Sequence, residues 1–120
     1  VVGLVLPELE GKIDGTSIRV PTPNVSVIDF KFVPTKATDI DSVNDAIKDA
    51  SEGKLKGILS TNELPLVSVD FNHNPHSSIF DLAETQVIES QFVRVMSWYD
   101  NEWGFSNRMI DTAKAMGNLL

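Results

Sequence analysis

Residues 91–116, QFVRVMSWYDNEWGFSNRMIDTAKAM, contain the strongest structural signals in the chain. The run QFVRVMSWY at 91–99 is rich in β-branched and aromatic residues, which is typical of a strand. The polar triplet at 100–102 follows it, and an apolar stripe at helical spacing then predicts a helix from about Trp103 to Met116. That stripe consists of Phe105, Met109, Ala113 and Met116. The stretch therefore predicts a strand that leads through a short polar turn into a helix.

A second helix is predicted at residues 39–52, where apolar residues again recur at helical spacing. These residues are Ile40, Val43, Ala46, Ile47 and Ala50. Thr38 or Asp39 can cap the start of this helix, and Gly53 can end it. Its outer face carries several carboxylates, which we interpret as a solvated face.

The remaining strand signals lie between and before these helices. They are TSIRVP at 16–21, NVSVIDFKFV at 24–33, LPLVSVDF at 64–71, SSIF at 77–80 and TQVIE at 85–89. In the run 24–33 the alternation places Ile28 and Phe30 on a mostly apolar face, which is expected to be the better covered side of the strand. Residues 1–9 resemble the end of a helix. Because strands and helices do not alternate strictly, residues 1–120 predict a single α+β domain with a mainly antiparallel or mixed sheet and helices covering one face.

Composition and charge exclude several classes of function. Ten basic residues against seventeen acidic ones give a formal net charge of −7, which argues against a general nucleic-acid or anionic-membrane surface. The chain has no cysteine, which excludes disulfides, thiolate metal sites and a cysteine nucleophile within it. Its seven glycines form neither of the two common phosphate-binding loop motifs. No apolar run approaches the roughly 18 residues of a membrane span.

A few residues could still carry chemistry. His73 and His76, in FNHNPHSS, are the only histidines, and we interpret them as part of a hydrogen-bonded turn rather than a metal site. Arg19 is the only arginine in the first 93 residues. A guanidinium can grip a phosphate or a carboxylate with two donors, although chemistry alone favours a structural ion pair for Arg19. The triplet Asn24-Val25-Ser26 fits a glycosylation sequon, which we treat as a chance match.

The aromatic residues around the polar triplet Asp100-Asn101-Glu102 form another candidate. Base rates favour a core role for such a cluster, but a polar triplet between a strand end and a helix start is also a favoured place for ligand contact. The amide of Asn101 offers both a donor and an acceptor to a ligand that itself carries an amide.

Several stretches together resemble the C-terminal portion of phosphorylating glyceraldehyde-3-phosphate dehydrogenase. They are VGLVLPELEGKIDGTSIRVPTPNVSVIDF at 2–30, EGKLKGIL at 52–59, LPLVSVDFN at 64–72 and VRVMSWYDNEWGFSNRM at 93–109. The resemblance covers essentially the whole chain in unbroken order. FNHNPHSS and NEWGF also resemble the sister enzyme erythrose-4-phosphate dehydrogenase, but RVPTPNVSVIDF and MSWYDNE favour the glyceraldehyde enzyme.

The resemblance implies roles for three residues. Arg19 falls where the family has an arginine that binds a phosphate of the substrate or the attacking inorganic phosphate. Asn101 matches the asparagine that contacts the nicotinamide carboxamide of NAD. Phe105 stands where the family usually has a tyrosine beside the nicotinamide ring, so that ring contact is expected without the hydroxyl. The family's catalytic cysteine and base histidine would precede Val1, so this chain is expected to hold no catalytic residue. No metal is expected either, because two histidines at the spacing of His73 and His76 are weak evidence for a metal site.

The chain is therefore expected to be the C-terminal part of the catalytic domain of a glycolytic, NAD-dependent dehydrogenase, with the Rossmann domain outside it. Expected partners are glyceraldehyde 3-phosphate, inorganic phosphate and that N-terminal Rossmann domain. The resemblance further implies a cytoplasmic, full-length enzyme that is a homotetramer. The acidic charge leads us to expect no nucleic-acid partner and no membrane partner. Alternatives are a fragment of the erythrose enzyme and a stand-alone, non-catalytic assembly module.

Overall fold

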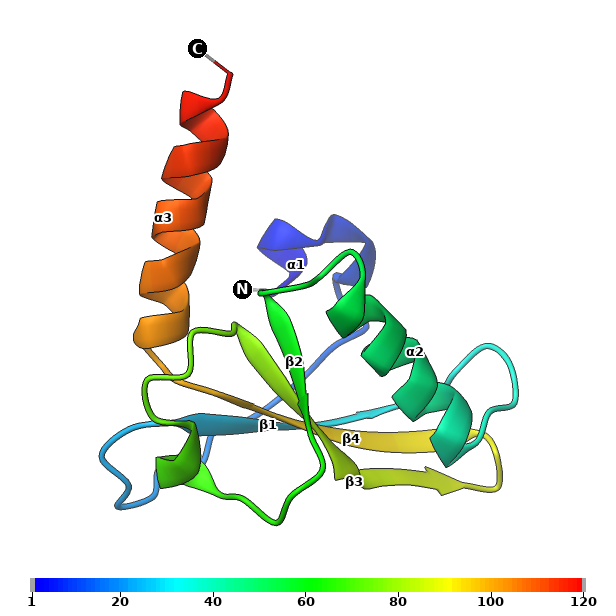
Figure 1. Ribbon diagram of the computed structural model, residues 1–120. Coiled ribbons are helices and arrows are strands. Elements are labelled where there is room, and N and C mark those ends of the chain that lie inside the picture. Colours follow the sequence, from blue (N-terminus) through cyan, green and yellow to red (C-terminus); the bar gives the residue numbers. More distant parts are fainter. Residues whose placement is uncertain (1, 120) are drawn as a thin grey trace.

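The computed structural model describes residues 2–119 (Figure 1). The elements in chain order are α1 (Val2–Val5), the 3-10 helix η1 (Pro7–Leu9), β1 (Ser26–Phe32), α2 (Ile40–Glu52), β2 (Leu59–Asn62), the 3-10 helix η2 (Ser68–Phe71), β3 (Ser78–Ile88), β4 (Phe92–Tyr99) and α3 (Trp103–Gly117). The two longest helices and strand β4 lie within two residues of where the sequence pattern predicts them.

One four-stranded sheet organises the chain, with the strand order β1-β4-β3-β2. β4 pairs antiparallel with β1 on one side and with β3 on the other, whereas β2 pairs parallel with β3. Trp98 of β4 is the partner of Val27 in β1 and of Ile79 in β3. A register shift between Asp81 and Gln86 interrupts the β3–β4 ladder. The predicted α+β class with a mixed sheet is confirmed.

Some predicted strands take another form. Residues 64–71 are not a strand but a loop that ends in η2. Pro65 cannot donate to a ladder, and the Asp70 carboxylate accepts the Val67 N–H at 2.8 Å, so a local turn replaces extended pairing. Residues 16–21 belong to no strand, although their sequence is β-rich. The predicted runs at 77–80 and 85–89 are joined in the single strand β3, and β2 was not predicted.

Helix α2 forms as its sequence predicts and lies against the sheet. Oδ1 of Asp39 accepts the Ser42 N–H at 2.7 Å and caps the helix start, and Gly53 ends the helix. The helix contacts β2 and β3. Its Asn44 donates to the Leu82 carbonyl at 3.1 Å. This side-chain bond ties α2 to the irregular part of β3.

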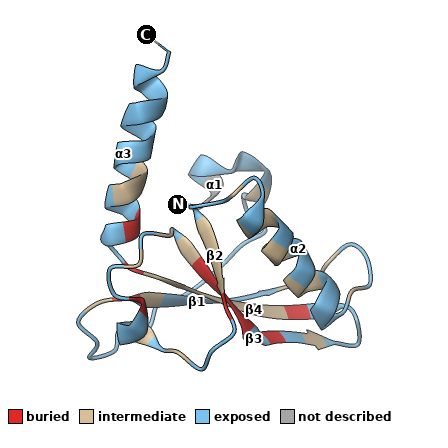
Figure 2. Cartoon of the chain, viewed as in Figure 1, coloured by how far each residue is buried: buried red, intermediate tan, exposed pale blue. Residues whose placement is uncertain are grey.

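Helix α3 is anchored only at its base and then points away from the sheet (Figure 1), so cover for the sheet comes from α2 and not from both helices. Gly104, in its first turn, is buried against the backbone carbonyl of His76. One turn further on, Nη1 of Arg108 donates to the Gly57 carbonyl at 3.1 Å. Beyond this base the helix is exposed in Figure 2.

Six apolar residues are buried among the described residues: Val25, Phe71, Ile79, Phe80, Leu82 and Val93. Three of them, Val25, Phe71 and Ile79, form one cluster, and Leu66 and Trp98 pack against it. The rings of Phe71 and Trp98 stack with their centroids 5.5 Å apart. This contact packs η2 against β4 of the sheet.

The prediction that the apolar face of β1 would be well covered is wrong for this chain. Ile28 is 53% exposed and Phe30 is 41% exposed, because no element among residues 2–119 packs over them. The stripe of α3, with Phe105, Met109 and Met116, is exposed as well. Within the described residues, no helix combines the length and the apolar character that a membrane crossing requires.

The close approach of Gly104 predicts a specific sensitivity. A Cβ added there would lie 2.8 Å from the His76 carbonyl oxygen, which is backbone and cannot rotate aside. Gly104→Ala should therefore lower the free energy of unfolding by about 1–3 kcal/mol, as overpacking does elsewhere. The measurement is urea unfolding followed by circular dichroism.

Gly117 is the matched control on the same helix. A Cβ at Gly117 meets nothing within 4 Å, so Gly117→Ala should be neutral or should stabilise by at most about 1 kcal/mol. Equal stabilities for the two variants would contradict the close approach at Gly104.

Candidate functional site

The junction between β4 and α3 is organised around the carboxylate of Asp100. Oδ1 accepts the backbone N–H groups of Glu102 at 3.0 Å and Trp103 at 2.8 Å, and so caps the start of α3. Oδ2 accepts the backbone N–H of His73 at 2.9 Å and Nδ2–H of Asn24 at 2.8 Å. One side chain thus joins three segments that are far apart in the sequence.

These bonds keep the Asp100 carboxyl ionised. The side chain is only 3% exposed, and this burial would by itself raise the pKa. The N–H groups of Trp103, His73 and Glu102 and the Asn24 amide all favour the charged form, and together they outweigh burial. The net effect lowers the pKa of Asp100 to about 2, so the carboxylate is charged throughout the physiological range.

Two of the segments that contact Asp100 contain left-handed backbone. Val25 has φ 71° and His73 has φ 60°, and neither is glycine. For the β-branched Val25 this conformation is strained, at a cost of about 1–3 kcal/mol. The strain persists because the Val25 side chain is buried in the core while Asn24 beside it bonds to Asp100.

Asn101 and Phe105 lie at the exposed base of α3. Nδ2 of Asn101 donates to Oγ of Ser26 at 2.7 Å, across the β1–β4 pair. Oδ1 of Asn101 has no hydrogen-bond partner among residues 2–119 and is available as an acceptor. Phe105 is 67% exposed. The junction therefore offers an amide and an aromatic ring to solvent on a well-anchored base.

The aromatic residues near the triplet do not form one buried cluster, contrary to what base rates favour. Trp98 stacks on Phe71 and belongs to the core. Trp103 is half exposed and its ring lies 5.3 Å from that of His73, centroid to centroid. Phe105 faces solvent. One of these rings is thus part of the core, and the other two are largely exposed.

Arg19 lies in an exposed segment without regular secondary structure. Within residues 2–119 it makes no side-chain hydrogen bond or ion pair, although the chain carries seventeen acidic residues. The structural ion pair that chemistry alone favours is therefore not found in the described part of the chain. No polar contact links Arg19 to Asn101 or Phe105 there.

The histidine pair takes part in separate local contacts. His73 lies against Trp103, whereas Nδ1 of His76 lies 2.8 Å from Oδ1 of Asn74. Burial, with the nearby charge of Arg108, lowers the pKa of His76. Among residues 2–119, no group of three or more His, Asp or Glu side chains is arranged to hold a metal ion.

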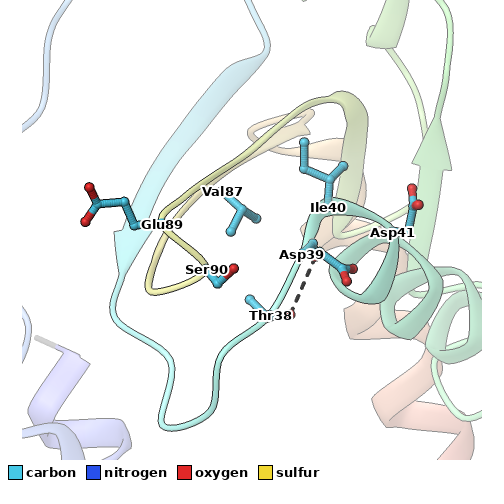
Figure 3. A pocket seen from close by; sticks show the side chains of 7 residues that line it. All are labelled: Thr38, Asp39, Ile40, Asp41, Val87, Glu89 and Ser90. Carbon is cyan, nitrogen blue, oxygen red and sulfur yellow. Dashed lines mark hydrogen bonds between the residues drawn. The ribbon is translucent and has the colours of Figure 1, made fainter.

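An open hollow of about 500 Å³ lies between the start of α2 and the β3–β4 turn (Figure 3). It is lined by Thr38, Asp39, Ile40, Asp41, Val87, Glu89 and Ser90. Three of these residues are acidic and none is basic, which disfavours a phosphate-bearing ligand. The hollow lies at the other end of β4 from Asn101, about 25 Å away along the strand, and does not belong to the same site.

Comparison with known proteins identifies the family. Residues 1–101 match the family model described as the C-terminal domain of glyceraldehyde 3-phosphate dehydrogenase. The chain belongs to this family. The family resemblance predicted from RVPTPNVSV and SWYDNEWGFSNR is thereby confirmed.

Similar proteins extend the match beyond residue 101. Glyceraldehyde-3-phosphate dehydrogenase of Xanthobacter flavus is 67% identical over 118 residues, which are 98% of this chain and 35% of that protein. The protein of the same name from Cereibacter sphaeroides is 61% identical over 119 residues, 99% of this chain and 36% of its own length. The protein of the same name from Zymomonas mobilis is 54% identical over 120 residues, which are 99% of this chain and 36% of that protein. The chain thus spans about a third of the length of these curated relatives.

In this member of the glyceraldehyde 3-phosphate dehydrogenase family, three residues of the junction had no role assigned from the sequence. In the sequence, Asn24 and Ser26 form a chance match to a glycosylation sequon, and Asp100 is one member of a polar triplet. The structure shows that Asn24 bonds to Asp100 and Ser26 to Asn101. The sequence offers one signal for these bonds. Each bonded pair joins a residue of RVPTPNVSV to a residue of SWYDNEWGFSNR, the two stretches with the strongest family resemblance.

The hydrogen bonds of Asp100 predict a dependence of stability on pH. Because its pKa falls from an ordinary 3.8 to about 2 on folding, the stabilisation is fully present above about pH 4 and is lost as the pH falls towards 2. The shift corresponds to about 2 kcal/mol. Urea unfolding from pH 6 to pH 2 should show a stability gap between the parent and Asp100→Asn that narrows in this window.

Asp39→Asn is a comparison variant away from the junction. Hydrogen bonds from Ser42 also lower the pKa of the Asp39 carboxyl, so its stability difference should narrow in the same direction. A gap for Asp100→Asn that stays constant down to pH 2 would show that the charge of Asp100 does not stabilise the fold.

Proposed function

We propose that this chain is the C-terminal part of the catalytic domain of a cytoplasmic, NAD-dependent, phosphorylating glyceraldehyde-3-phosphate dehydrogenase of glycolysis. The observation that carries the proposal is that the Asn101 amide, which Ser26 holds, and the Phe105 ring are both exposed at the anchored base of α3. The names of the similar proteins supply the reaction. In this reaction an aldehyde is oxidised and its acyl group is transferred to inorganic phosphate.

The residues of the junction suit a nicotinamide. Oδ1 of Asn101 can accept an N–H from the carboxamide, while Nδ2 is already engaged by Ser26. The Phe105 ring offers an apolar surface to the side of a planar ring, without the hydroxyl that a tyrosine would add. The bound cofactor would supply the hydride acceptor for oxidation of the aldehyde. The part of Asn101 is to hold the carboxamide and so to fix the orientation of the nicotinamide ring.

Arg19 is proposed to bind the phosphate of the substrate or inorganic phosphate. Its guanidinium is exposed and makes no ion pair within residues 2–119, so its donors are available to an anion. A guanidinium stays charged at any working pH and can donate two parallel N–H groups to two phosphate oxygens. Its positive charge would also make the electrostatic potential around Arg19 less negative, which favours an anion on a chain whose formal net charge is −7.

The remaining machinery lies outside these 120 residues in this proposal. The chain has no cysteine, so another part of the enzyme supplies the thiolate that attacks the aldehyde. The N-terminal Rossmann domain would bind most of NAD, and the full-length enzyme would be a homotetramer. The exposed apolar face of β1 and the exposed stripe of α3 are surfaces of the kind that such partners cover.

Substitution of Arg19 in the full-length enzyme tests the phosphate assignment. Arg19→Lys keeps the positive charge but loses the paired N–H donors of the guanidinium, and it should lower kcat/KM for the phosphate-bearing reactants moderately. Arg19→Ala loses both and should cost roughly 2–4 kcal/mol in kcat/KM for the phosphorylated aldehyde or for inorganic phosphate. The KM for NAD should scarcely change. Steady-state kinetics with glyceraldehyde 3-phosphate and with erythrose 4-phosphate measures these effects and identifies the preferred substrate.

Lys36→Ala provides a control for the loss of one exposed positive charge, since Lys36 lies on the β1–α2 loop. It should leave phosphate kinetics unchanged. The melting temperature of Arg19→Ala should stay close to that of the parent, because the side chain is exposed. Normal phosphate kinetics with a lowered melting temperature would instead favour a structural ion pair.

The isolated 120-residue chain is expected to show no dehydrogenase activity and no tight binding of NAD. Micromolar affinity requires about 8 kcal/mol, which Asn101 and Phe105 cannot provide without the rest of a cofactor site. Calorimetric titration with NAD checks this, and a micromolar dissociation constant would support a stand-alone binding module in place of an enzyme fragment.

A further inference from the structure

We propose that Ser26 is a positioning residue for the nicotinamide site: its hydroxyl oxygen holds the carboxamide of Asn101 in the orientation that receives the cofactor. The inference rests on the proposed function, since it requires that Asn101 contacts nicotinamide. It goes further in assigning the orientation of that amide to a residue 75 positions earlier in the chain.

The first step of the argument is how Ser26 reaches Asn101. β1 and β4 run antiparallel, with Ser26 opposite Tyr99 at the end of the ladder. Asn101 follows β4 by two residues, and its Nδ2 donates to the Ser26 Oγ at 2.7 Å. The partner of the amide is therefore the first residue of a paired strand, whose backbone is fixed by the sheet.

The second step is a paired arrangement around Val25. Asn24, on one side of Val25, donates to the Asp100 carboxylate, and Ser26, on the other side, accepts from Asn101. Two adjacent residues of the β4–α3 junction thus bond to the two neighbours of a single strained residue. Val25 keeps φ at 71° because its side chain is buried and both of its neighbours are held.

The third step is the consequence for the amide. Asn101 is exposed, and packing alone would leave its side chain free to rotate. The bond to Ser26 engages Nδ2 and leaves Oδ1 as the acceptor for an amide N–H of the ligand. An amide that is already oriented loses less conformational freedom when the ligand binds, so affinity for the nicotinamide end should be higher.

The test uses the full-length enzyme with Ser26→Thr and Ser26→Val, which have nearly the same shape and differ in the hydroxyl. Ser26→Ala is the truncated variant. The dissociation constants of NAD and of ADP-ribose, which lacks nicotinamide, are measured by calorimetry. We expect Ser26→Val and Ser26→Ala to bind NAD about tenfold more weakly. Ser26→Thr should retain most of the affinity, and all variants should bind ADP-ribose as the parent does.

Ser97→Ala is the matched control in the same sheet. It removes the hydrogen bond between the Ser78 and Ser97 hydroxyls and does not contact Asn101. Its NAD affinity should equal that of the parent. If Ser26→Val weakens NAD and ADP-ribose by the same factor, Ser26 supports the fold generally and the inference is wrong.

Calorimetry of NAD binding to Asn101→Ala, alone and combined with Ser26→Val, separates the nicotinamide role of Asn101 from the positioning role of Ser26. We expect Asn101→Ala to weaken NAD binding and the added Ser26→Val to have no further effect, because the two residues act as one unit. If Asn101→Ala leaves NAD binding unchanged, the nicotinamide role of Asn101 fails and this inference fails with it. If Asn101→Ala weakens binding but Ser26→Val does not, only the positioning role of Ser26 is overturned.

Discussion

The carboxylate of Asp100 joins the segments on which the proposed site depends. It accepts four hydrogen bonds, from the loop before β1, the loop before β3 and the start of α3. A buried charge without such donors would be costly, and here each oxygen receives two of them. Because the same carboxylate caps α3 and anchors Asn24, the position of the helix and the position of the strand start are set together.

This arrangement places an exposed amide and an exposed aromatic ring on a rigid base. The amide of Asn101 and the ring of Phe105 are open to solvent, yet both adjoin residues that are fixed by the sheet, by the cap or by the close approach of Gly104. The strained residue Val25 lies between Asn24 and Ser26, which bond to this base. Strain that the surrounding structure maintains near a polar, exposed group is a feature of functional sites more than of ordinary loops.

Only part of the apolar surface of the chain is buried within its own fold. The buried cluster around Phe71 and Ile79 is small, while Ile28, Phe30 and the stripe of α3 remain exposed. Exposed apolar residues that gather into a patch are typical of interfaces. It accords with a chain that spans about a third of the length of the relatives it matches. The site we propose is accordingly one part of a larger one.

The sequence by itself determined the elements whose signals are local. Helical spacing with a cap at Asp39 predicts α2, and the strand and stripe around Asp100 predict β4 and α3. The family resemblance predicts roles for Arg19, Asn101 and Phe105, and these roles stay predictions. The sequence did not predict that residues 64–71 form a loop ending in η2, because the Asp70 carboxylate, which accepts the Val67 N–H, stabilises a local turn in place of a strand. Nor did it predict the bonds of Asn24 and Ser26, which join residues 76 and 75 positions apart. Only the pairing of β1 with β4 brings these side chains together, and no local spacing encodes which strands pair.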